Sequence, residues 1–137
     1  LHPPSTAATL NLAAVAAQAA RLYAPYDAAF AKRCRAAAER AFAAAERHPR
    51  ILARPMGTGG GPYDDPTLTD EFHWAASELF ITTGDARYAE IVRRSPHFLA
   101  VPSTANPDGK RDDPPRAMTW QGTAALGSLS LLLAGKG

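Results

Sequence analysis

The stretch that decides the fold is GGGPYDDPTLTDEFHWAASELFITTGDARY, residues 59–88. It joins a glycine-rich loop to a helix expected over 70–83, for which Thr69 is the candidate N-cap. Gly84 closes this segment, as glycine commonly does at the left-handed end of a helix. Apolar residues recur through it at helical spacing. They predict a buried stripe made of Phe72, Ala75, Ala76, Leu79, Phe80 and Thr83.

Four further helices are expected, and no segment reads convincingly as a strand. They cover about 6–23, 28–47, a short segment between Asp85 and Ser95, and about 119–134. Only a few residues separate the first two, which predicts an antiparallel hairpin. The fold class is therefore all-α, built from antiparallel helix hairpins. The apolar face of the first helix is expected to consist of Leu12, Val15, Ala19, Leu22 and Tyr23.

The composition excludes several classes of protein. The 137 residues, 46% of them hydrophobic, are enough for one domain with a real core. A net charge of +2 without a basic stripe argues against nucleic acid as a partner. No apolar run reaches the length of a membrane span, so no membrane partner is expected. The single Cys34 excludes an internal disulfide and a multi-cysteine zinc site. Because the chain opens on Leu1 and shows no signal peptide, we expect a processed or truncated start.

Two acidic residues, Asp70 and Glu71, begin the helix at 70–83 and admit three interpretations. In the first, their charges complement the helix dipole, an effect of about 0.3–1 kcal/mol. In the second, they ligate calcium, which takes six to eight oxygens and would find carbonyls in the preceding loop around Thr67. Acid–base catalysis is the third interpretation. Adjacent helical side chains point about 100° apart, however, and nothing here sets two carboxylates at the spacing an inverting glycosidase needs.

The aromatic residues and the histidines leave their roles open. Tyr63, just after the glycine run, is a candidate for stacking on a sugar ring or for packing on the scaffold. Trp74 and Trp120 are candidates for the core or for a sugar platform. The glycine run lacks the Lys-Ser/Thr pair of a phosphate loop. His73 is expected in a groove or at the surface, and the four scattered histidines show no zinc-binding spacing.

Three blocks of the chain together resemble glycoside hydrolase family 9. They are STAATLNLAAVAAQAARLYAPYDAAFAKRCRAAAERA at 5–41, the stretch at 59–88, and MTWQGTAALGSLSL at 118–131. The most specific element is the glycine-rich loop followed by DEF-x-W-A-A-x-E-L and TTGD. Members of this family are inverting β-1,4-glucanases (cellulases) built on an (α/α)6 toroid. The resemblance implies a secreted or periplasmic hydrolase acting on cellulose or related β-glucans.

The resemblance also implies that the catalytic residues lie outside these 137 residues. The family's base is an aspartate in a DAGD-type motif, its proton donor is a glutamate near the C-terminus, and an HxR-type motif contacts substrate. No DAGD motif occurs in the chain, and the resemblance implies that the chain begins after that motif and stops before the other two. Residues 1–137 are therefore predicted to be a central segment of the catalytic domain, with no catalytic residue of their own. Their expected partners are a β-1,4-glucan and the remaining parts of that domain.

Site residues follow from the same resemblance. It implies a structural calcium ion and substrate contacts from Tyr63 and Trp120. Gly122 stands where an aspartate is common, and His73 where a tyrosine is common. The first departure removes support from the metal site, and the second alters the groove. The metal ligands implied by the family are Thr67, Asp70, Glu71 and Gln121.

Two other functions remain compatible with the sequence. One is a helical-hairpin scaffold that binds partners without catalysis. The other is a different carbohydrate-active enzyme on an (α/α)6 toroid.

Overall fold

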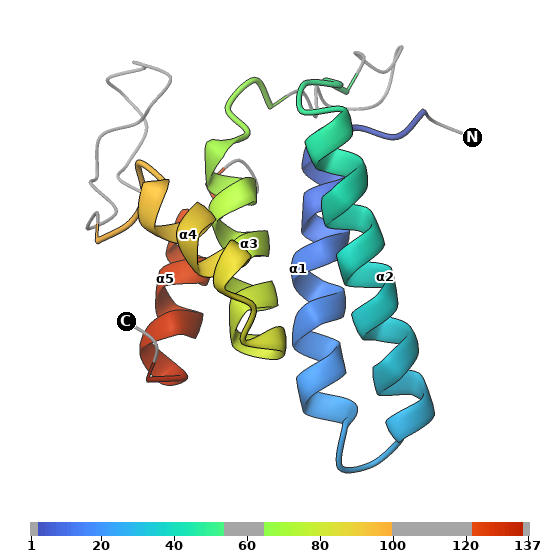
Figure 1. Ribbon diagram of the computed structural model, residues 1–137. Helices are drawn as coiled ribbons and strands as arrows, with labels where there is room; N and C mark the ends of the chain where they lie inside the picture. Colours follow the sequence, from blue (N-terminus) through green and yellow to red (C-terminus); the bar gives the residue numbers. More distant parts are fainter. Residues whose placement is uncertain (1–2, 54–64, 100–121, 136–137) are drawn as a thin grey trace.

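Five helices account for most of the part of the chain that the structure describes, in a computed structural model (Figure 1). The described residues are 3–53, 65–99 and 122–135. The helices are α1 (Thr6–Tyr23), α2 (Ala28–Arg47), α3 (Thr69–Thr83), α4 (Ala86–Arg94) and α5 (Ala124–Leu133). Within these ranges no helix is both long enough and apolar enough to cross a membrane. The predicted all-α class is confirmed.

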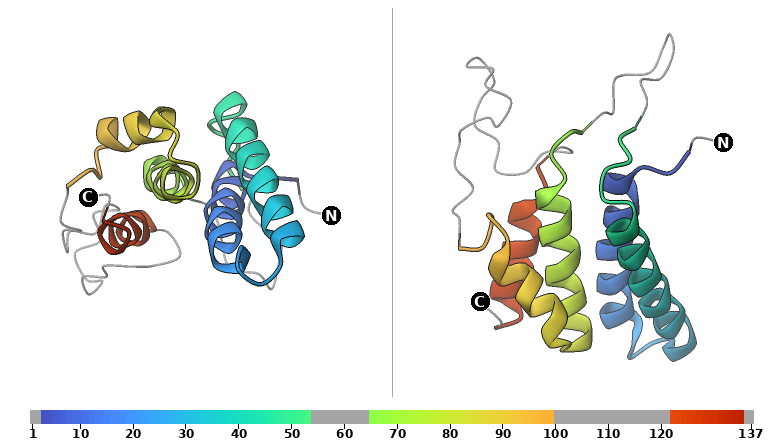
Figure 2. Two further views of the ribbon diagram at one scale, coloured as in Figure 1. Left: turned by 60° about the horizontal axis from the view of Figure 1, so that its bottom comes forward. Right: turned by 45° about the horizontal axis from the view of Figure 1, so that its top comes forward.

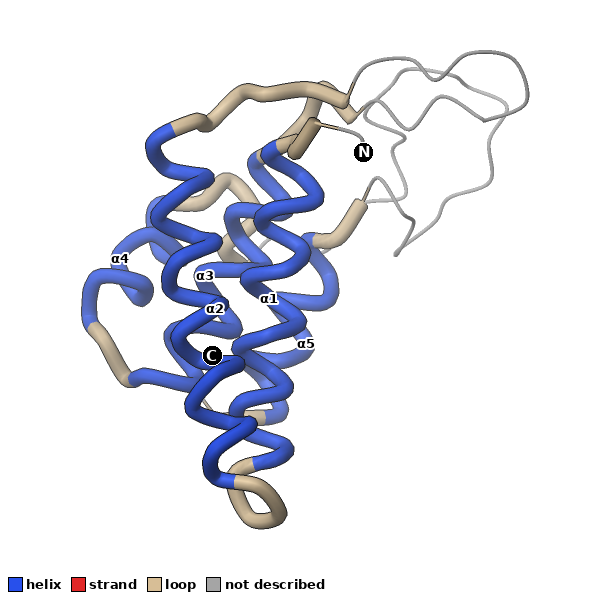
Figure 3. Tube along the Cα trace, turned by 90° about the vertical axis from the view of Figure 1, so that its right-hand side faces the viewer, coloured by secondary structure: helices blue, strands red, loops and turns tan. Residues whose placement is uncertain are grey.

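The helices form two layers. Helices α1, α3 and α5 lie side by side and run in the same direction, from the top of Figure 1 to the bottom. Helix α2 runs back along α1, and α4 runs back across α3 (Figures 1 and 2). The trace viewed from the side shows the same hairpin of α1 and α2 (Figure 3). The N-termini of α1, α3 and α5 therefore gather at one end of the molecule.

Local signals explain where most of the helices begin and end. Ser5, Asp27 and Asp85 each accept a hydrogen bond from a backbone N–H of the first turn that follows, as N-caps do. Gly84 ends α3 at φ 71°, in the left-handed region that favours glycine. The predicted ranges of α1 and α2 are confirmed.

Two predicted helix starts are wrong. Helix α3 begins at Thr69 rather than after it, with Leu68 at the N-cap and no side-chain cap. The Thr69 hydroxyl lies 3.0 Å from Nε2 of His97 instead. Helix α5 begins at Ala124 rather than near 119, because the Thr123 amide and hydroxyl bond to Asp70.

The predicted apolar face of α1 is not the face that packs within this chain. Leu12 and Leu22 are 55% and 62% exposed, and Val15 and Tyr23 are also exposed. The buried face carries Leu10 and a row of small residues: Ala13, Ala14, Ala17 and Ala20. Small side chains let α1 approach α2 and α3 closely. Apart from Leu10, the larger apolar residues of α1 point the other way.

Phe42 of α2 anchors the core between the layers. It is fully buried and makes edge-to-face contacts with Phe72 of α3, at a ring-centroid distance of 5.9 Å, and with Tyr88 of α4, at 5.3 Å. Such pairs add about 0.5–1.5 kcal/mol beyond the area they bury. Phe42 thus ties the first hairpin to the second.

Helix α5 packs on α3 through a glycine. A Cβ added at Gly127 would lie 2.9 Å from Cα of Trp74 and 3.1 Å from Cδ2 of His73. No larger residue fits at this separation without moving one helix away from the other. The contact holds α5 at a fixed height along α3, which aligns their N-terminal ends.

Candidate functional site

Three buried carboxyl groups gather where the chain enters α3. Asp65, Asp70 and Glu71, called the acid cluster below, are 7%, 3% and 1% exposed. Asp65 Oδ1 accepts a hydrogen bond of 3.0 Å from the Thr67 amide, a local turn that this residue type favours. Asp70 and Glu71 occupy the first turn of α3. The amino end of that helix favours negative charge there.

Asp70 connects the starts of α3 and α5. Its Oδ2 accepts hydrogen bonds from the Thr123 backbone N–H at 2.8 Å and from the Thr123 hydroxyl at 3.2 Å. Thr123 is itself buried. The carboxylate therefore positions the segment that enters α5, although 53 residues separate the two partners.

Two carboxyl oxygens of the cluster are buried without a hydrogen-bond partner among the described residues, namely Asp70 Oδ1 and Glu71 Oε2. Burial first, and then the neighbouring carboxyls of Asp70 and Asp65, raise the pKa of Glu71 to about 9. A hydrogen bond between the Asp70 and Glu71 side chains acts in the same direction. Near neutral pH, the cluster therefore needs either a proton on Glu71 or a cation beside it.

The oxygen donors of the cluster are of the type that a hard cation binds, because carboxylates are the main ligands of Ca²⁺. Within the described residues, however, no three His, Cys, Asp or Glu side chains are arranged to hold a metal ion by themselves. A bound ion would need further oxygens. The predicted ligand Thr67 lies beside the cluster, with its amide bonded to Asp65. The predicted ligand Gln121 lies outside the described residues, as do the predicted substrate contacts Tyr63 and Trp120.

His73 is buried, which corrects the expectation of a groove or surface histidine. It is 1% exposed, and its ring lies 5.9 Å from that of His97. Its Nε2 lies 3.4 Å from the Ser128 hydroxyl, and its Nδ1 has no partner in the part of the chain that is described. Burial and then the charge of His97 lower the pKa of His73 to about 4. The imidazole is therefore neutral near pH 7 and belongs to the contact of α3 with α5.

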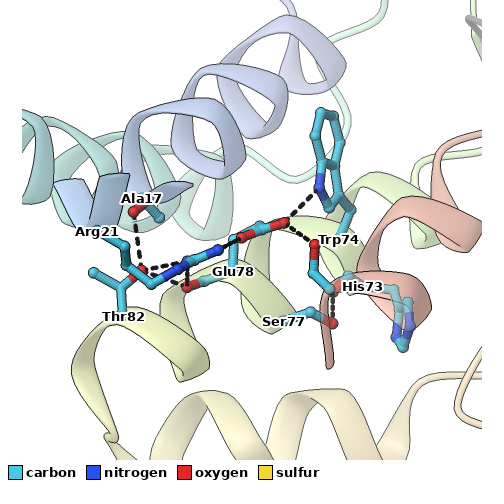
Figure 4. Close-up of polar contacts among 8 residues, drawn as sticks. Ala17, Arg21, His73, Trp74, Ser77, Glu78 and Thr82 are labelled. Atoms are coloured by element: carbon cyan, nitrogen blue, oxygen red, sulfur yellow. Dashed lines mark hydrogen bonds and ion pairs between the residues drawn. The ribbon is translucent and has the colours of Figure 1, made fainter. Parts of the chain in front are cut away.

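Glu78 is the buried acid that sequence reasoning missed. It is fully buried, and donors from three helices meet its carboxylate (Figure 4). Oε2 pairs with the Arg21 guanidinium of α1, while Oε1 accepts from the Trp74 indole and from the Ser130 hydroxyl of α5. Arg21 also donates to Thr82, whose hydroxyl lies 3.0 Å from the Ala17 carbonyl. We call these contacts the Glu78 network.

One signal in the sequence could have revealed this network. Glu78 directly precedes Leu79 and follows Ala75 and Ala76 by three and two residues, which places it among the apolar residues of the predicted buried stripe. A carboxylate in an apolar stripe requires a buried partner. Arg21 is the only charged residue of α1.

Three comparisons place this architecture among known proteins. The chain matches the model of glycosyl hydrolase family 9 over residues 1–135. It is 47% identical over 133 residues to endoglucanase C of Cellulomonas fimi, covering 96% of this chain and 11% of that protein. It is 43% identical over 145 residues to a cellulose 1,4-β-cellobiosidase of Acetivibrio thermocellus, covering 100% of this chain and 16% of that protein.

Solved structures of family 9 enzymes also match the chain. The crystal structure of the family 9 endoglucanase J30 aligns with a TM-score of 0.76 and 32% identity, covering 96% of this chain and 23% of that one. A triple mutant of J30 that binds zinc aligns equally well. The parallel row of α1, α3 and α5, with α2 and α4 returning beside it, is part of an (α/α)6 toroid.

The helical layers and the matched structures together define one part of an (α/α)6 helical toroid. The chain belongs to glycosyl hydrolase family 9. It spans only about a sixth or less of the two curated relatives and about a quarter of the solved endoglucanase.

Proposed function

We propose that this chain is a central part of the catalytic domain of a secreted or periplasmic endo-β-1,4-glucanase that hydrolyses cellulose or a related β-glucan with inversion. The match to family 9 over residues 1–135 carries the proposal. It is supported by relatives named as an endoglucanase and a cellulose cellobiosidase. In this proposal the catalytic carboxylates come from other parts of the domain. This chain supplies the wall that holds their geometry.

The role of the chain can be tested by transplanting it. The segment of Cellulomonas fimi endoglucanase C that matches this chain would be replaced by the corresponding residues of the chain. We expect the chimaera to release reducing sugar from a soluble cellulose derivative, whereas the 137-residue chain alone should release none. A chimaera that folds but is inactive on β-glucans would contradict the proposal. So would mutation-sensitive hydrolysis by the pure chain.

We further infer that the acid cluster holds a structural calcium ion in the assembled domain. Asp70 and Glu71 would ligate it, with the nearby Asp65 carboxylate and oxygens from Thr67 and Gln121. The buried, unpartnered oxygens Asp70 Oδ1 and Glu71 Oε2 support this inference. When bound, the ion would supply positive charge that balances the carboxylates. The chain's own contribution is to fix the entry into α3 against Thr123.

Thermal unfolding tests the proposed calcium site. Adding calcium after chelation should raise the melting temperature at pH 8, since a ligand that binds only the folded state stabilises it. Asp70→Ala should abolish this rise. Asp85→Ala is the matched control, because it removes an aspartate that caps α4, away from the cluster. It should lower the melting temperature in the absence of calcium yet keep the rise. The calcium claim fails if wild type shows no rise, or if both variants lose it.

A further inference from the structure

Two histidines that are far apart in the sequence lie side by side in the structure. His73 comes from α3 and His97 from the turn that follows α4, yet their ring centroids are 5.9 Å apart. The planes of the two rings are tilted by 52° rather than stacked. The spacing of histidines in the sequence did not predict this pair, because it forms only when α4 folds back across α3 (Figures 1 and 2).

Each of the two rings has one nitrogen beside a hydroxyl group. Nε2 of His97 lies 3.0 Å from the Thr69 hydroxyl, and Nε2 of His73 lies 3.4 Å from the Ser128 hydroxyl. A histidine that binds a metal through one ring nitrogen usually donates the N–H of the other to an oxygen, which fixes the tautomer and the orientation of the ring. With Nε2 as the N–H donor in both histidines, the lone pair that can bind a ligand is on Nδ1.

The Nδ1 atom of His73 gives an independent indication of a ligand. It is buried without a hydrogen-bond partner among the described residues, and the residue is only 1% exposed. A Cβ added at Gly127 would lie 3.1 Å from Cδ2 of His73, so α5 packs on the edge of the ring that carries Cδ2 and Nε2. Nδ1 lies on the opposite edge, away from α5. Because a buried acceptor without a partner costs free energy, a cation bound at this atom would stabilise the folded chain.

The separation of the two rings suits one metal ion between them. With metal–nitrogen distances of about 2.0–2.1 Å, the centroids of two imidazoles on one zinc ion are roughly 5–6.5 Å apart. The turn that carries His97 is also held in place, because its backbone N–H donates to the Ser95 hydroxyl at 3.2 Å and the adjacent Phe98 packs on the core. His97 is only half-buried, which gives an ion a path from solvent.

We propose that Nδ1 of His73 and Nδ1 of His97 together bind a first-row transition-metal ion such as Zn²⁺, which ties the turn after α4 to α3. Water would complete the coordination, since no third His, Cys, Asp or Glu side chain in the described part of the chain is placed to join them. Imidazole nitrogens suit Zn²⁺, Cu²⁺ and Ni²⁺, whereas the carboxylates of the acid cluster suit Ca²⁺. The two sites therefore differ in chemistry, and this one does not depend on the proposed glucanase function.

Zinc binding to the 137-residue chain is measured by calorimetry and by thermal unfolding, with calcium present throughout so that zinc does not compete for a free acid cluster. The melting temperature of wild type should rise by about 5 °C when free zinc exceeds the dissociation constant a hundredfold. His97→Ala should abolish this rise. Thr69→Val, which removes the hydroxyl beside Nε2 of His97, should weaken zinc binding by about 10–100-fold. His48→Ala is the matched control, because this exposed histidine at the C-cap of α2 should contribute nothing.

Nitrogen-15 NMR of the wild-type chain then identifies the ligand atoms. Zinc should shift the Nδ1 signals of His73 and His97 and leave both ring nitrogens of His48 unchanged. The proposal is overturned if zinc does not raise the melting temperature of wild type, or if it leaves the two Nδ1 signals in place. It is also overturned if His97→Ala binds zinc as tightly as wild type does, or if His48→Ala abolishes the rise.

Discussion

Glu71 and Glu78 lie two turns apart on α3 and are both almost completely buried, yet their surroundings are opposite. Around Glu78 every partner of the carboxylate is a donor: a guanidinium, an indole N–H and a hydroxyl. Around Glu71 the charged groups that raise the pKa of its carboxyl are those of Asp70 and Asp65. The difference shows that the middle of α3 is completed by this chain alone. Its N-terminal end is completed only by a proton or a cation.

Helix α5 contacts both places. Thr123, just before it, bonds to Asp70, and Ser130 within it bonds to Glu78. The close approach at Gly127 lies between these two points. A change of charge at either acid should therefore alter the packing of α5 on α3.

The largest effect is expected where the carboxylate is fully partnered. Glu78→Gln keeps the shape of the side chain. It leaves only one acceptor oxygen, however, for donors that bond to both carboxylate oxygens in the wild type. It also leaves Arg21 without its buried counter-charge. Removing one member of a buried, hydrogen-bonded ion pair costs about 3–5 kcal/mol. We therefore expect a loss of about 3 kcal/mol in the free energy of unfolding by urea.

Glu39→Gln is the matched control for that prediction. Glu39 pairs with Arg35 four residues earlier on α2, where both side chains are largely exposed. Such a pair contributes about 0.5 kcal/mol or less. If Glu78→Gln costs no more than Glu39→Gln, the Glu78 network does not hold the three helices together.

At Glu71 we expect the opposite effect on stability, a gain at alkaline pH when the carboxyl is replaced. A carboxyl whose pKa is about 9 when folded and 4.5 when unfolded binds its proton more tightly in the folded state. Its contribution is fully present below pH 4.5 and is lost as the pH rises toward 9. Metal-free wild type should therefore lose several degrees of melting temperature between pH 5 and 9, and Glu71→Gln should flatten this decline.

Calcium makes the contrast sharper. A calcium ion bound as proposed would replace the proton on Glu71, so saturating calcium should restore stability mainly at high pH. Glu71→Gln should respond weakly to calcium but be the more stable protein at pH 8 without it. Should Glu71→Gln instead destabilise the metal-free chain at pH 8, the claim that this carboxyl is unfavourably buried would be wrong.

Sequence patterns predicted the helices well because capping and periodicity are local. Ser5, Asp27, Asp85 and Gly84 each act through neighbours a few residues away, and they define the element boundaries. The acids of the candidate site were also visible, since Asp70 and Glu71 stand at a helix start. Their burial was not visible, because it depends on how the distant Thr123 and the rest of α5 pack against α3.

The errors arose where the partner is far away in the chain. His73 looked like a surface residue because the side chains that bury it, around Gly127 and Ser128, lie more than 50 residues later. The apolar stripe of α1 was recognised, but periodicity reports only that a face will be covered. It does not say by what, and in this chain the face remains exposed.

The smallest effect is expected at His73, a buried base on the same helix as Glu71 and Glu78. It therefore gives an independent check on the comparison of these two acids. Its pKa of about 4 lies below the ordinary 6.5, so its contribution is present above pH 6.5 and is lost as the pH falls toward 4. His73→Leu, similar in size, should remove part of the acid-side loss of melting temperature, by about 2–3 °C at pH 4.5. It should leave the decline between pH 7 and 9 in place, since Glu71 causes that one. If His73→Leu changed the alkaline limb instead, the two groups would be coupled and the acid cluster would extend to the α3–α5 contact. If it changed neither limb, the imidazole would be titrating in contact with water, contrary to its burial against α5.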